Sequence, residues 1–166
     1  MGGQGNKGAD TLRSRMNAEP IEPDFSLGPL SIWAKGRPYA DADNGWDQAF
    51  VEVYARVSLP NAWVEVGSGN GLVSMVLARF VRDLERLDGT LSGKAELQVD
   101  WINLTLIGDG IGHSAVELEI YPGHVEQQHR FRFQVDQTQV RSARQQAKAL
   151  LAKYPVPAKY ASDPMP

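Results

Sequence analysis

The stretch 62–84, AWVEVGSGNGLVSMVLARFVRDL, joins three kinds of sequence pattern in immediate succession. Apolar and polar residues alternate over 62–66, which predicts a strand with one covered face. From Leu72 onward the apolar residues recur at helical spacing, which predicts an amphipathic helix. Gly89 stands where a left-handed residue would end that helix. We therefore expect a strand, a turn and a packed helix.

Three glycines, Gly67, Gly69 and Gly71, separate the two patterns and allow two interpretations. In the first they form a tight strand-to-helix turn, with Ser68 or Asn70 as the helix N-cap. In the second they form the cofactor loop of an S-adenosylmethionine-dependent methyltransferase-like enzyme, where a helix N-terminus follows a glycine-rich loop. That enzyme would need alternating strands and helices downstream. The sequence that follows favours the turn.

The rest of the chain predicts an α+β fold. Four alternating segments follow the helix with no helical pattern between them, which is typical of an antiparallel sheet with one wet face. We expect a meandering antiparallel β-sheet of about 6–7 strands in the order β-β-β-α-β-β-β-β-α, with two helices packed on it. The expected strands are 27–34, 49–59, 62–66, 95–99, 102–106, 116–120 and 131–135, and the second helix is 138–153.

The composition predicts one domain between two irregular ends. Residues 1–24 should form a flexible N-terminal arm, 25–155 a single α+β domain, and 156–166 a Pro-rich irregular tail. No apolar run reaches the roughly 18 residues of a membrane span, and the N-terminus lacks the apolar segment of a secretory signal. With no cysteine in the chain, thiolate chemistry is excluded. We expect a cytoplasmic protein.

The net charge of −3 conceals two regions of opposite sign. Residues 19–126 carry seventeen Asp and Glu against seven Lys and Arg, whereas 127–153 carry six basic residues against one Asp. The basic residues Arg141, Arg144 and Lys148 would share one face of the last helix, a pattern that could contact phosphates. No exposed aromatic residues are interleaved with them, and the domain is acidic overall. We therefore predict a solvated face and no nucleic acid partner.

The most distinctive polar segment is the acidic stretch 41–47, DADNGWD. It resembles the start of a calcium loop, but its glycine stands one place early and a strand pattern follows. We predict no metal site, no cofactor and no catalytic residues, since no nucleophile, acid and base stand in a recognisable setting. A tryptophan among carboxylates instead suits a protein interface with a basic partner. The candidate binding residues are Asp41, Asp43, Trp46, Asp47 and Glu52, with Glu117 and Glu119 from a strand face.

From about residue 25 to 155 the chain resembles the WapI-type bacterial immunity proteins. The resemblance lies in the acidic 41–47 segment before FVEVYARV, the helix SMVLARFVRDLERLDGT, the strands ELQVDWINLTLIGDG and VELEIY, and the closing FRFQV and LLAKYP. It implies a non-catalytic protein that binds the cognate C-terminal domain of a polymorphic or contact-dependent toxin. Such toxins are often nucleases with basic clefts. The resemblance leaves the oligomeric state open.

Overall fold

The computed structural model describes residues 22–121 and 126–160, and within them eight strands form two antiparallel sheets. The first sheet contains β1 (Phe25–Leu27), β2 (Leu30–Gly36), β3 (Phe50–Leu59) and β4 (Ala62–Val73), paired in chain order. The second sheet contains β5 (Ser92–Val99), β6 (Ile102–Asp109), β7 (His113–Ile120) and β8 (His129–Asp136), also in chain order.

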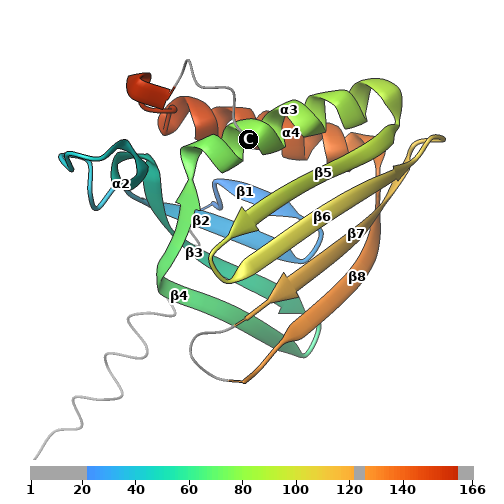
Figure 1. Cartoon of the computed structure of the whole chain (residues 1–166). Coiled ribbons are helices and arrows are strands. Elements are labelled where there is room, and N and C mark those ends of the chain that lie inside the picture. The colour runs from blue at the N-terminus through green and yellow to red at the C-terminus, as the bar shows by residue number, and fades with distance from the viewer. Residues whose placement is uncertain (1–21, 122–125, 161–166) are drawn as a thin grey trace, which may run out of the picture.

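Two long helices lie side by side along one side of the sheets (Figure 1). They are α3 (Ser74–Thr90), which connects the sheets, and α4 (Gln137–Lys153), which follows the second. A short helix, α2 (Gly45–Ala49), precedes β3, and a 3-10 turn (Ala158–Tyr160) follows α4. Residues 1–21 of the predicted arm and 161–166 of the predicted tail lie outside the described residues.

The predicted α+β class is confirmed, and the two expected helices are present. The structure differs from a single meander because the strands divide into two sheets of four. Alternation shows which side of a strand is covered, but not which strand lies beside it. Helix α3 connects β4 to β5, and β5 pairs with β6 rather than with β4.

One core joins both sheets and both helices. The buried face of each strand and the apolar stripes of α3 and α4 form a single cluster, in which the Phe25 and Phe80 rings meet edge to face at 6.0 Å. The β1–β2 turn also reaches the second sheet, since a Cβ on Gly28 would lie 2.5 Å from the Phe133 ring. Gly28 has a φ of +55°, which a residue with a side chain rarely adopts. This turn splits the predicted strand 27–34 into β1 and β2.

The glycine-rich segment is not a turn, so that prediction is wrong. Residues 62–73 form one long strand that pairs with β3 almost throughout, and the register shifts opposite Val53 and Ala55. The chain therefore does not reverse at residues 67–71. The strand continues through them, with an irregularity in its pairing with β3. Helix α3 begins after Val73 without a side-chain cap and ends at Thr90. Its left-handed C-cap is Leu91, with a φ of +60°, rather than the predicted Gly89.

Candidate functional site

The acidic loop, residues 37–47, runs from the end of β2 into α2 and is anchored at its base by Arg37. The Arg37 guanidinium donates to Ser74 Oγ at 2.8 Å and to the carbonyl of Pro155. Ser74, fully buried at the start of α3, donates in turn to the carbonyl of Ala49 at 3.0 Å. These bonds fix both ends of the loop to the body of the protein.

Aromatic contacts hold the rest of the loop. The backbone of Gly45 lies against the Tyr160 ring, where an added Cβ would come within 2.0 Å of it. The Tyr39 ring packs on Phe50 with centroids 5.8 Å apart. Asn44 caps α2, since its side-chain oxygen accepts from the Asp47 amide at 2.8 Å. Ring packing at Gly45 and Tyr39 and the Asn44 cap therefore hold the loop in place.

The three carboxylates of this loop lack cationic partners among the described residues. Asp41 and Asp43 are exposed, and Asp47 is half-buried with its carboxylate accepting from Asn44 Nδ2 at 2.6 Å. None of the three forms an ion pair with residues 22–121 or 126–160. Beside them Trp46 is 56% exposed and Tyr39 is 54% exposed. The loop thus presents aromatic area and uncompensated negative charge together.

The structure brings Glu52 near this loop. Glu52 lies on the outward face of β3, two residues from Phe50, and its register partners in β2 and β4 are Gly36 and Gly71. The loop and Glu52 therefore belong to one side of the first sheet.

Glu117 and Glu119 lie elsewhere, on the outer face of the second sheet. Glu117 pairs with Arg132 at 3.0 Å, and Glu119 accepts from Arg130 Nε at 2.7 Å. The hydroxyl of Tyr121 and the guanidinium of Arg130 lower the pKa of the Glu119 carboxyl. These two carboxylates are neutralised within the sheet.

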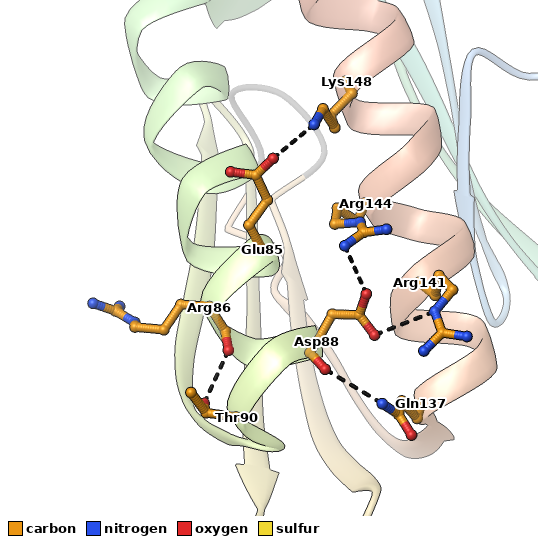
Figure 2. A network of polar contacts seen from close by, with 8 residues as sticks. All are labelled: Glu85, Arg86, Asp88, Thr90, Gln137, Arg141, Arg144 and Lys148. Atoms are coloured by element: carbon orange, nitrogen blue, oxygen red, sulfur yellow. Dashed lines mark hydrogen bonds and ion pairs between the residues drawn. The ribbon is translucent and has the colours of Figure 1, made fainter.

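The basic segment 127–153 is likewise used internally. Figure 2 shows Arg144 and Arg141 of α4 pointing toward Asp88 of α3, at 2.8 and 3.5 Å, and Lys148 pointing toward Glu85, at 2.7 Å. The basic stripe on α4 is therefore part of a helix-to-helix ion-pair network rather than a simply solvated face. All six basic residues of the segment form ion pairs: Arg130, Arg132, Arg141, Arg144, Lys148 and Lys153.

Sequence reasoning missed a group of aromatic residues on the outer face of the first sheet. Trp33 and Tyr54 are direct partners across β2 and β3, with ring centroids 5.4 Å apart. Trp63, near the start of β4, is 67% exposed. All three occupy the polar positions of their alternating strands. Large aromatic residues at outward positions were the signal that could have identified this face.

The structure gives no support to the cofactor-loop interpretation. A methyltransferase loop places its glycines between a strand and a helix N-terminus. Here the backbone of residues 67–71 belongs to β4, and Gly71 packs under the Phe50 ring. Within the described residues, no group of three or more His, Asp or Glu could hold a metal ion, and no helix is long and apolar enough to cross a membrane.

Comparison with known proteins identifies a family. The model described as the immunity protein WapI-like family matches residues 10–155. No curated protein matches the chain. A chain from the crystal structures of Trypanosoma brucei MRP1/MRP2 is 15% identical, over 87% of this chain and 92% of that one, with a TM-score of 0.43. At that score the likeness does not establish a shared fold.

Proposed function

Because the chain belongs to the WapI-like immunity protein family, we propose that it binds and neutralises a cognate secreted toxin domain in the cytoplasm of the producing bacterium. It would do so by occupying the toxin's active site or an essential surface, without catalysing a reaction. The toxin domain would present a basic surface, such as the phosphate-binding cleft of a nuclease.

The acidic loop is the observation that carries this proposal. Asp41 and Asp43 have no counterion among the described residues. By contrast, every Lys and Arg of the basic segment 127–153 forms an ion pair with a carboxylate of this chain. Uncompensated surface carboxylates accelerate encounter with a basic partner and favour one orientation. The adjacent Trp46 supplies the large aromatic area found at interface hot spots. Because packing already holds the base of the loop, the loop loses less conformational entropy when it binds a partner.

The proposal is tested with the toxin gene expected directly upstream of this one. Co-expression of that toxin's C-terminal domain with this protein should protect the host and yield a stable complex. The double substitution Asp41→Asn/Asp43→Asn should slow association and reduce its salt dependence, while Trp46→Ala should weaken binding about tenfold or more.

A matched control removes two carboxylates from the second sheet. Glu117→Gln/Glu119→Gln changes the formal charge by the same amount, but its carboxylates are paired with Arg132 and Arg130. We expect this variant to bind like the wild type. If the wild-type protein neither protects cells nor binds the toxin domain, the proposed function is wrong. If the control variant loses binding while the loop variants keep it, the loop is the wrong surface.

A further inference from the structure

We infer that the binding surface extends from the acidic loop across the outer face of the first sheet. Its occupant would be a toxin-domain surface that presents Lys and Arg side chains together with an apolar patch. This inference rests on the proposed function and assigns the face that performs it. Four observations support the assignment.

The first observation is the aromatic content of this face. Trp33 and Tyr54 pack side by side at its middle, and the ammonium group of Lys35 lies 5.7 Å from the centroid of the Tyr54 ring. Trp63 of β4 lies opposite Ser58, at the far end of β3, and exposes two thirds of its surface. Tryptophan and tyrosine are enriched at the anchoring positions of protein interfaces, and their ring faces attract cations.

The second observation is the contrast with the other sheet. The outer face of the second sheet carries three cross-strand or same-strand ion pairs, formed by Lys94, Glu96, Glu117, Glu119, Arg130 and Arg132. Each carboxylate in these pairs therefore has a cation within the sheet, whereas Asp41 and Asp43 of the acidic loop have none among the described residues. Tyr121 is the aromatic residue beside them, and its hydroxyl already donates to Glu119 at 2.7 Å. The six charged side chains of that face are thus paired with one another.

The third observation is continuity with the acidic loop. Phe50, against which Tyr39 packs, begins the outward row of β3, and Glu52, Tyr54 and Arg56 follow at every second residue. A ten-residue strand is about 33 Å long. A stable complex usually buries about 800 Å² on each partner, and a patch of that area has a width similar to the length of this strand. The loop and Trp63 therefore lie at opposite ends of one interface-sized surface.

The fourth observation concerns the charges inside this surface. Arg56 Nε donates to Glu65 at 2.7 Å across β3 and β4. Burial opposes ionisation of Glu65, but hydrogen bonds from Tyr54 and Arg56 outweigh it and lower the pKa of that carboxyl. Arg56 and Glu65 thus neutralise each other in the middle of the face. The net negative charge is left at the loop, which matches a partner with its basic groups at one end.

The test uses the full-length protein and the C-terminal domain of the toxin encoded directly upstream. Titration calorimetry compares Trp63→Ala with Ile107→Ala, since Ile107 is a 47% exposed apolar residue on the outward side of β6. Trp63→Ala should weaken binding about tenfold or more, and Ile107→Ala by less than about twofold. Because both side chains are exposed, both variants should melt near the wild-type temperature.

Hydrogen exchange on the wild-type complex provides the second measurement. Binding should slow amide exchange in the acidic loop and in β2 to β4, and leave β6 to β8 unchanged. Protection confined to β6 to β8, or undiminished affinity in Trp63→Ala, would overturn the inference while leaving the proposed function intact. If the wild-type protein does not bind the toxin domain at all, the proposed function fails and the inference fails with it.

Discussion

Gly71 shows how a single residue determines the packing beside the acidic loop. A Cβ at this position would lie 1.8 Å from Cε2 of Phe50, so the ring of Phe50 occupies the place of a side chain. The Gly71 amide also donates to the Asp100 carboxylate at 3.0 Å, and its carbonyl accepts from the Asp100 amide at 3.2 Å. Gly71 therefore joins β4 both to Phe50 and to the β5–β6 turn.

The substitution Gly71→Ala should destabilise the protein by about 1–3 kcal/mol, because the Phe50 ring must move away from the added methyl group. Gly67→Ala is the matched control, since a Cβ there would meet nothing within 4 Å. It should change the free energy of unfolding by no more than about 0.5 kcal/mol. Urea denaturation measures both. Equal stability of the two variants would contradict this account of Gly71.

The sequence could not distinguish these roles for the glycines. Glycine-rich sequence predicts a turn because glycine adopts conformations that other residues avoid. Gly71 is glycine instead because an aromatic ring covers its backbone, and that ring belongs to a residue twenty-one positions earlier. The acidic loop, by contrast, could be identified from its local pattern. Its anchoring by Arg37, Ser74 and Tyr160 could not, because those residues meet only in the folded chain.

At the scale of elements, one buried carboxylate contributes to the pairing of α3 with α4. The Asp88 side chain is 5% exposed and contacts both Arg141 and Arg144 (Figure 2). Removing its charge would leave the Arg144 guanidinium, whose Nε is already buried without a hydrogen bond, with no ion-pair partner within 4 Å among the described residues. An uncompensated charge in such a place is costly.

Asp88→Asn should therefore lower the free energy of unfolding by about 1–3 kcal/mol, less than for a fully buried pair because both arginines reach solvent. The comparison variant is Glu85→Gln, which breaks the exposed pair with Lys148 one turn away. Its effect should stay below about 1 kcal/mol. Thermal unfolding at low and high salt measures both. A larger loss for Glu85→Gln would refute the importance of the Asp88 contact.

Helices and strands differ in how well their patterns predict them. The helical spacing of Val76, Leu77, Phe80 and Leu84 predicted most of α3, because a helix buries its stripe whatever lies opposite. Strand alternation located most of the strands but could not show that they divide into two sheets. The short helix α2 was missed because five residues carry too little periodicity.

The whole molecule repeats one arrangement, four antiparallel strands followed by a long helix. The repeat is structural, and the two halves share a single core. Their outer faces differ, because the first sheet carries the aromatic residues and one ion pair and the second carries three ion pairs. The acidic and basic regions of the sequence meet in the folded chain. The basic segment 127–153 pairs with carboxylates of the body, and the carboxylates of the acidic loop form no ion pair among the described residues.

A shared core means that neither half should fold alone, although each has a complete sheet and helix. Fragment 22–91 would expose to water the inner face of its sheet, including Phe25, and the apolar stripe of α3, including Phe80. Fragment 92–160 would expose Leu104 and Leu118. About seventy residues with half a core seldom exceed marginal stability. Each fragment should give a poorly dispersed amide NMR spectrum and no cooperative melt, whereas the segment 22–160 should unfold in one transition. A cooperative melt in either fragment alone would show that its sheet and helix form an independent domain.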